Sequence, residues 1–322
     1  MKYCAVIRTL GTAGDKYQTL LDSLDAQTIR PEKILVYIPH GYELPKETIG
    51  WEEYVRCEKG MITQRSLPFE EVNTDYILFC DDDLSLEPDS VARLFQGLEG
   101  NDGDCISVNT FPMEKASIIS QLKKAVSGYA FPRRDDGWAF RVMRNGGYTY
   151  NRKPHEDVLP TESAAGPCLL IKTKVYHAMH FDDERWLETF GYALGDDLLF
   201  YNKLHIMGYR VLVHYDAGIV HLDAGTSSKK LPEDWIERCA ALSYITQFRI
   251  KYSLAKTHKE KVLCVISNVI KYIEQISFTL VRELLKNKRW VLFSYLRGIK
   301  KGMAYVHSSE YKRIPAFDAY VK

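Results

Sequence analysis

The sequence lacks the features that mark several classes of protein. Its seven cysteines are scattered singly with no Cys-x-x-Cys pair, which excludes a disulfide-rich secreted module and indicates reduced core thiols in a cytosolic protein. No run of about 20 apolar residues is uninterrupted, so no transmembrane helix is expected. Only five apolar residues stand between Lys2 and Arg8, so no signal peptide is predicted. Internal repeats and low-complexity stretches are also absent.

Net charge is nearly absent as well, but the charges are unevenly distributed. The chain has 43 Lys and Arg against 42 Asp and Glu, a formal net charge of +1. Residues 249–322 carry 16 basic and 5 acidic residues, a net of +11, which leaves 27 and 37, a net of −10, in residues 1–248. An acidic part suits a metal site, and a basic part suits an anionic surface.

The first half of the chain alternates short apolar runs with amphipathic helical stretches. Such alternation predicts an α/β fold, a mostly parallel sheet with helices on both faces. Helices are expected over 88–98, where Pro88 suits a first turn, and over 196–207. The expected strands are 3–7, 34–38, 76–80, 105–108, 168–171 and 210–214.

Two segments depart from this alternation. Residues 112–160 are rich in Gly, Pro, Arg, Asn and Tyr, which predicts a long, partly irregular insertion flanking a site. From Leu231 onward the pattern is helical, which predicts a division into residues 1–230 and a helical extension over 231–322. Apolar residues at helical spacing between Leu263 and Leu280 favour a packed amphipathic helix, with dimerisation or membrane-surface contact as the alternatives.

Three carboxylates follow an apolar strand at Asp81, Asp82 and Asp83. Ligands of open α/β sheets bind beyond the carboxyl ends of the strands. Adjacent carboxylates repel one another, and a hard divalent cation such as Mg²⁺ or Mn²⁺ relieves that repulsion. A solvated acidic turn before Pro88 is the alternative.

Two further elements bear groups suited to the same chemistry. Asp196 and Asp197 follow Gly195 at the start of an apolar helix, where capping needs one carboxylate and leaves the second to act as a general base. His221 ends a short apolar run, and an Asp/His ligand set suits Mn²⁺. Routine capping and a structural histidine are the alternatives.

Taken in order, these elements resemble the family 2 glycosyltransferases of the GT-A fold. The resemblance covers residues 2–228, with a faint further match at 296–298. The triplet 81–83 is similar to the family's Asp-x-Asp motif, and 195–198 (Gly-Asp-Asp-Leu) to its acidic base motif. The other matching segments are 23–36, 165–172, 181–183 and 208–211 followed by His221.

The resemblance implies a role for each matching residue. Asp197 is the base that deprotonates the acceptor hydroxyl, and Asp196 orients the acceptor or supports the metal shell. The cation that bridges the donor diphosphate is held by Asp83, His221 and Asp81. The nucleotide-sugar contacts are Thr9, Arg65, Asp81 and Asp82.

The expected function is therefore metal-dependent, inverting glycosyl transfer. The donor is a nucleotide-diphosphate sugar, with UDP favoured by family frequency and galactofuranose or a hexose as the sugar. The acceptor is a hydroxyl of a cell-surface glycan or a lipid-linked glycan. Residues 37–41 (Tyr-Ile-Pro-His-Gly) lack the family's usual base-contacting Asp. A nucleotidyltransferase and a non-catalytic nucleotide- or glycan-binding module are the alternatives.

The basic tail has several interpretations. No nucleic-acid-binding motif accompanies its charge, so nucleic acid is not an expected partner. An anionic membrane surface fits its lysines and arginines better, which predicts a cytoplasmic protein at the inner face of the cell membrane. Close packing on the acidic part is the alternative, and a homo-oligomer is left open.

Overall fold

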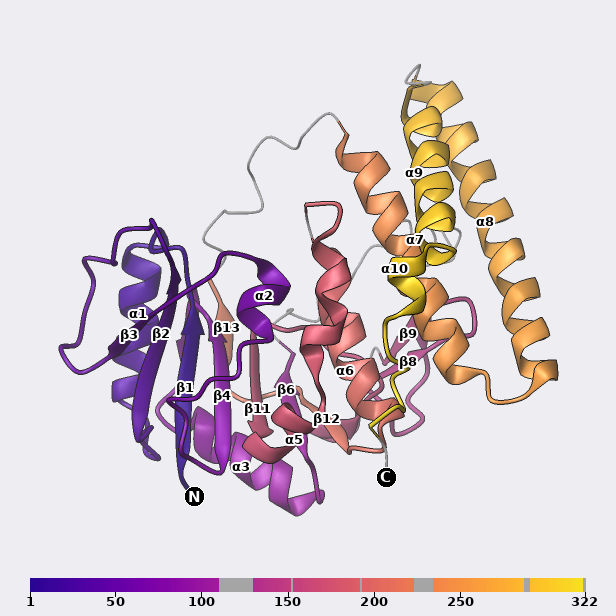
Figure 1. Ribbon diagram of the computed structural model, residues 1–322. Coiled ribbons are helices and arrows are strands. Elements are labelled where there is room, and N and C mark those ends of the chain that lie inside the picture. Colours follow the sequence, from indigo (N-terminus) through magenta and orange to yellow (C-terminus); the bar gives the residue numbers. More distant parts are fainter. Residues whose placement is uncertain (110–129, 152, 192, 223–233, 287–289, 321–322) are drawn as a thin grey trace.

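The structure, a computed structural model, describes residues 1–109, 130–151, 153–191, 193–222, 234–286 and 290–320. An eight-stranded sheet has helices on both faces, and three long helices lie at one end of it (Figure 1). This is the α/β architecture expected from the sequence, with the layers of a GT-A fold. The first residues of the predicted C-terminal helix, 231–233, lie outside the described residues.

The strands of the large sheet follow the order β10-β12-β6-β11-β4-β1-β2-β3. Neighbours pair in parallel except where β10 and β11 take part, so the sheet is mostly parallel, as predicted. Edge strand β3 was not predicted, because Glu53 and Arg56 interrupt its apolar residues and only Cys57 is buried. The strands are β1 (Tyr3–Arg8), β2 (Lys33–Pro39), β3 (Glu53–Cys57), β4 (Tyr76–Asp81), β6 (Cys105–Val108), β10 (Val158–Pro160), β11 (Cys168–Lys172) and β12 (Val211–His214).

Strand β1 illustrates how the sequence places the two helical layers. Alternate side chains of a strand point to opposite faces. Tyr3, Ala5 and Ile7 pack in one core cluster with α1 (Asp15–Asp25) and α3 (Ser90–Gly100). The intervening Cys4 and Val6 belong to the cluster on the other face. That second face is covered by α2 (Met61–Arg65), α5 (Thr173–Ala178), the 3-10 helix η1 (Phe181–Glu188) and α6 (Asp196–Ile206).

Two small sheets complete the strand structure. β5 (Leu84–Leu86) pairs antiparallel with β13 (Ile219–His221). β7 (Ala130–Arg133), β9 (Tyr148–Asn151) and β8 (Phe140–Val142) form a three-stranded sheet in that order. The predicted irregular insertion is therefore partly regular, since four strands, β7 to β10, lie within it, while residues 110–129 lie outside the described residues.

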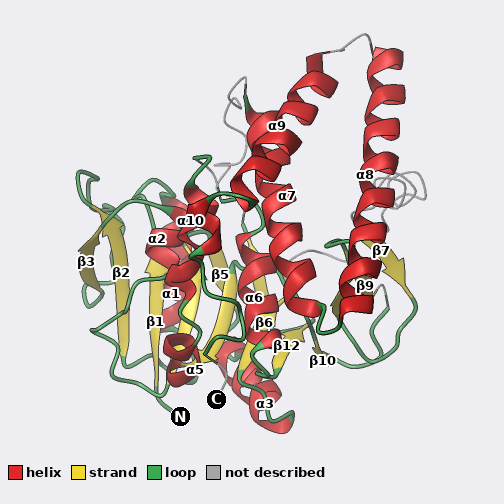
Figure 2. Cartoon of the chain, turned by 45° about the vertical axis from the view of Figure 1, so that its right-hand side comes forward, coloured by secondary structure: helices red, strands yellow, loops and turns green. Residues whose placement is uncertain are grey.

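The C-terminal helices are α7 (Trp235–Leu254), α8 (His258–Lys286), α9 (Trp290–Val306) and α10 (Ser309–Lys312) (Figure 2). Helix α7 joins the core of the sheet domain, because Leu242, Ile245 and Ile250 belong to the cluster on its second face. The basic tail also packs on the acidic part through charge. Buried Arg249 donates from Nε and Nη2 to the carboxylate of buried Glu184, at 2.6 and 2.5 Å.

One feature of α8 differs from the sequence expectation. Within the described residues, the stretch His258–Val281 is long and apolar enough to cross a membrane, judged by length and composition alone. A search for uninterrupted apolar runs does not detect it, because Lys271 and Glu274 lie in its middle. The cysteines agree better with expectation: all seven are free, and Cys239 is the one that is half-buried rather than buried.

Candidate active site

The three consecutive carboxylates, Asp81 to Asp83, contact different partners. Strand β4 ends at Asp81, whose carboxylate lies 3.5 Å from Nη2 of Arg8 at the end of neighbouring β1. The Asp82 carboxylate accepts a 2.5 Å hydrogen bond from the Thr9 hydroxyl. The predicted repulsion is thus relieved partly within the protein, by a cation on one carboxylate and a hydroxyl on the next. Arg8 was not recognised from the sequence, although it directly follows the first predicted strand.

Asp83 takes its partner from a distant part of the chain. Pairing of β5 with β13 sets His221 opposite Leu84, and the backbone N–H of Leu222 donates to the Asp83 carbonyl at 2.8 Å. As a result, Nε2 of His221 lies 3.0 Å from Oδ1 of Asp83. The two residues expected to share a cation are therefore neighbours.

The second acidic pair lies at the N-terminus of α6. Gly195 precedes the helix with a φ of +88°, a conformation that glycine adopts without strain. Nη1 of Arg65, the last residue of α2, lies 2.5 Å from Oδ2 of Asp196 and 2.6 Å from Oδ1 of Asp197. The Asp197 side chain is 39% exposed and that of Asp196 is 16% exposed, so Asp197 is the more accessible carboxylate.

Burial and neighbouring charges set the protonation of this site. Burial raises the pKa of Asp196 to about 6, with the Arg65 guanidinium opposing the rise and the Asp197 charge adding to it. Burial also raises the pKa of Asp81 to about 7, against the opposing charges of Arg8 and Arg65. Two carboxyl groups of the site therefore titrate near neutral pH.

Gly166 allows the two halves of the site to approach each other closely. It precedes β11, and the carbonyl of the next residue, Pro167, accepts from the Asp81 N–H at 2.8 Å. A Cβ atom at Gly166 would lie 2.0 Å from Oδ1 of Asp197 and 2.4 Å from Nη2 of Arg65. Only glycine leaves room for these side chains in their present positions.

A cavity of about 370 Å³ unites the two acidic elements. Its walls include Asp81, His221 and the Arg65–Asp196–Asp197 cluster, all singled out from the sequence. Thr9, Asp82 and Asp83 are not among its lining residues. Residues that sequence reasoning missed also line it, namely Arg8, Met61 and Gln64.

The donor groups near this cavity suit a divalent cation in part. Across the part of the chain that the structure describes, no three His, Cys, Asp or Glu side chains cluster closely enough to hold a metal ion. The Asp83–His221 pair offers one oxygen and one nitrogen. Cations that work with diphosphate substrates are commonly held by one or two protein carboxylates, and the substrate supplies further oxygens. The pair therefore fits a cation completed by its substrate.

Part of the chain that forms this site matches a known protein family. Residues 53–159 match the model described as glycosyl transferase family 2. This part of the chain belongs to the family 2 glycosyltransferases. No curated protein matches the chain significantly.

The glycosyltransferase match covers part of the cavity lining. It includes Arg65 and the Asp81–Asp83 triplet, with strands β3 to β6. The acidic pair of α6 and His221 lie outside the matched segment, and the fold brings them to it. The match supports a glycosyltransferase, an enzyme class that takes a nucleotide-sugar donor and a glycan acceptor.

Proposed function

We propose that this protein is a metal-dependent, inverting glycosyltransferase with Asp197 as its catalytic base. The observation that carries the proposal is the cavity shared by Asp197 and the Asp81–His221 side of the site. Inverting transfer needs a base on one side of the reacting carbon and a diphosphate site on the other. A cavity with carboxylates on two walls supports that division of roles.

Asp197 suits the role of base better than Asp196 does. It is the more exposed of the two, and its Oδ1 lies 2.6 Å from Nη1 of Arg65. The Asp197 carboxylate would accept the proton of the acceptor hydroxyl as that oxygen bonds to the anomeric carbon. The bond from that carbon to the diphosphate breaks in the same step, and the nucleoside diphosphate leaves. One displacement inverts the configuration, and general-base catalysis of this kind contributes about 10²–10⁴ in rate.

Asp83 and His221 are the residues that would hold a Mg²⁺ or Mn²⁺ ion, with Asp81 the further predicted ligand. Family 2 members commonly use divalent metal ions. Bound there, the ion supplies positive charge that stabilises the departing diphosphate. The Thr9 hydroxyl donates to the Asp82 carboxylate at 2.5 Å, a contact that would fix the loop that the donor contacts.

Arg65 has a different neighbour from the one that the resemblance suggests. Its guanidinium contacts the acidic pair of α6, whereas the resemblance assigns it to the nucleotide. We therefore propose Arg65 as a positioning residue that keeps the Asp197 carboxylate aimed into the cavity.

The proposed donor is a UDP-sugar of the hexose or galactofuranose type, and the acceptor a cell-surface or lipid-linked glycan. Such an acceptor places the enzyme in the cytoplasm at the inner face of the cell membrane. The two-part organisation, with a catalytic domain over residues 1–230 and a helical extension over 231–322, remains part of this proposal. A non-catalytic binding module with the same fold is the competing proposal, and it predicts no turnover.

Turnover assays separate these proposals. Wild-type protein with Mn²⁺, a panel of sugar nucleotides and glycan acceptors should release nucleoside diphosphate and yield a product of inverted anomeric configuration. Asp197→Asn should lower kcat by about 10²–10⁴ while nucleoside diphosphate still binds. Asp182→Asn, an exposed site on η1, is the matched control and should retain full activity. An Asp197→Asn enzyme with unchanged kcat would refute the assignment.

A further inference from the structure

Helix α8 presents a row of large apolar side chains to solvent. Each is between 43% and 61% exposed, and they recur every three or four residues, with one longer step. Their spacing places them on one face of the helix over about 33 Å. We call this row the α8 stripe: Val262, Ile266, Val269, Ile273, Leu280 and Leu284.

The opposite face of α8 is the polar one, and it is packed against the protein. Lys271 is 1% exposed and donates from Nζ to the Asn145 carbonyl at 3.1 Å, in the loop between β8 and β9. Asn268 is also buried there. The helix is thus oriented with polar groups inward and apolar groups outward, the reverse of a helix packed on a soluble core.

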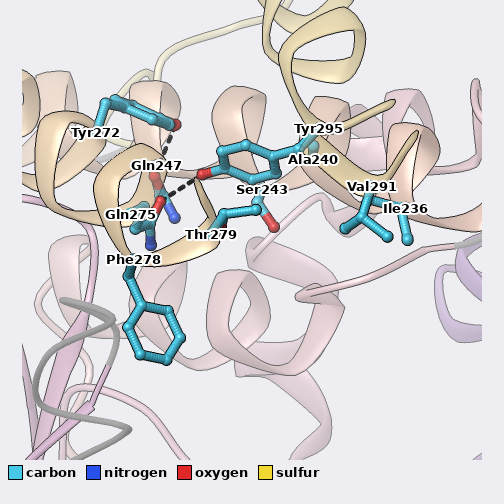
Figure 3. Close-up of a pocket in the computed structure, with 10 residues that line it drawn as sticks. All are labelled: Ile236, Ala240, Ser243, Gln247, Tyr272, Gln275, Phe278, Thr279, Val291 and Tyr295. Carbon is cyan, nitrogen blue, oxygen red and sulfur yellow. Dashed lines mark hydrogen bonds between the residues drawn. The ribbon is translucent and has the colours of Figure 1, made fainter. Parts of the chain in front are cut away.

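Hydrogen bonds around a cavity between the helices fix this orientation (Figure 3). The cavity, about 270 Å³, lies between α7, α8 and α9. Tyr272 of α8 donates to Oε1 of Gln247 on α7 at 2.9 Å, and Tyr295 of α9 donates to Oε1 of Gln275 on α8 at 2.6 Å. Rotating α8 to bury its apolar stripe would break both bonds and expose Lys271.

The α8–α9 hairpin also carries basic and exposed aromatic residues. Residues 258–306, which hold α8 and α9, contain ten Lys and Arg against three Asp and Glu, a net of +7. Trp290 and Phe293, at the start of α9, are 54% and 61% exposed. The end of α8 and the start of α9 lie together at the top of Figure 1, beyond the sheet. Exposed apolar, aromatic and basic groups in one hairpin are typical of a membrane-interface element.

We propose that the α8 stripe docks on an anionic lipid bilayer, with α8 lying in the plane of the membrane surface. Basic side chains near anionic lipids are attracted, whereas two copies of this hairpin would bring together segments of net charge +7. A membrane-spanning α8 would carry Lys271 and Glu274 into the hydrocarbon and release the bond to Asn145. Docking on the bilayer surface would bury the apolar stripe and leave the polar face of α8 packed against the protein.

Docking of this kind goes beyond the proposed transfer chemistry and brings the active site to a lipid-linked acceptor. Its test uses the full chain without donor, metal ion or acceptor, so it is independent of turnover. Co-sedimentation is measured with vesicles of phosphatidylcholine alone and with vesicles of phosphatidylcholine and phosphatidylglycerol. Wild-type protein should bind the anionic vesicles, and binding should weaken as salt is raised.

The variant Ile266→Glu/Ile273→Glu should bind at least about tenfold more weakly, because two side chains that enter the interface become charged. Leu44→Glu is the matched control: Leu44 is 46% exposed in the sheet domain, and its replacement should leave binding unchanged. Both positions are exposed, and circular dichroism melting checks that each variant is folded. Fluorescence quenching of Trp290 by brominated lipid, measured against Trp290→Phe, should report contact with the bilayer.

Three outcomes would overturn the proposal. One is equal binding of the double variant and wild type, and another is equal binding to neutral and anionic vesicles. The third is a dimer in solution that the double variant dissociates, together with no vesicle binding, which would assign the stripe to a second copy of the chain. Analytical ultracentrifugation without lipid measures that third outcome.

Discussion

The guanidinium of Arg65 lies 2.6 Å from the carboxylate of Asp197, although 132 residues separate them in the chain. The same nitrogen also contacts Asp196 at 2.5 Å, and the Arg65 side chain is only 8% exposed. This contact ties α2, within the matched family segment, to α6, outside it. A buried cation therefore joins two parts of the site that lie far apart in the sequence.

Removing that cation should destabilise the protein strongly. Arg65→Met leaves the buried Asp196 carboxylate without its partner, which should lower the free energy of unfolding by about 3–5 kcal/mol. Arg30→Met is the matched control, because Arg30 pairs with Asp25 on the surface and such pairs contribute about 0–1 kcal/mol. Urea unfolding measures both, and equal losses would contradict a structural role for the buried pair.

Replacing Gly166 should affect activity more than stability. A Cβ there would displace Asp197 or Arg65, and a misplacement of about 1 Å at a catalytic group costs about 10² in rate. We expect Gly166→Ala to lower kcat/KM by about that factor while the protein remains folded. Gly100→Ala, where a Cβ meets nothing within 4 Å, should keep wild-type kcat/KM. Wild-type activity in Gly166→Ala would disprove the close approach.

Metal dependence should be detectable through ligand-induced stabilisation. A nucleoside diphosphate with Mn²⁺ should raise the Tm of wild type more than either component alone, because binding stabilises the folded state by mass action. Asp83→Ala and His221→Ala should each abolish the part of the shift that needs Mn²⁺. His155→Ala, at an exposed loop site, should retain it. A shift that persists without Asp83 would place the metal elsewhere.

Lys271 should make stability depend on pH above neutrality. Burial lowers the pKa of Lys271 to about 7, so between pH 7 and its unfolded value of about 10.4 the unfolded chain binds more protons. Stability should therefore rise with pH over this window, by at most about 1.4 kcal/mol per pH unit from this group. Lys271→Met should remove this contribution. The free energy of unfolding, measured in urea at pH 7 and pH 9, tests this prediction. An equal change with pH in wild type and in Lys271→Met would contradict it.

Much of the sheet domain could be predicted because its signals are local. Strand β6 (Cys105–Val108) was predicted to the residue, and helix α6 (Asp196–Ile206) was predicted one residue too long. Both predictions depend only on the apolar periodicity and the turn residues of neighbouring positions. Strand β3 and the sheet β7-β9-β8 were not predicted. The residues of β3, β8 and β9 are mostly half-buried or exposed, so their own patterns are weak, and pairing with a neighbouring strand stabilises them instead.

Helix α8 shows the limit of periodicity. The spacing of its apolar residues correctly predicts a helix, yet the favoured interpretation of a packed apolar face was wrong. Ile266, Ile270 and Ile273 are at least half exposed, and Lys271 is buried instead. The apolar periodicity shows which residues share a face of the helix, but not whether that face packs on the protein or is exposed. The orientation of α8 depends on which side chains of α7, α9 and the β8–β9 loop offer hydrogen-bond partners.

The sequence by itself determined the composition of the site: consecutive carboxylates after a strand, an acidic pair at a helix start and a distant histidine. Only the tertiary structure decided how these groups combine. Asp83 meets His221 because β5 pairs with β13, and Arg65 meets Asp197 because Gly166 has no side chain. Charges interact according to distance in space, and chain folding sets that distance independently of separation along the sequence.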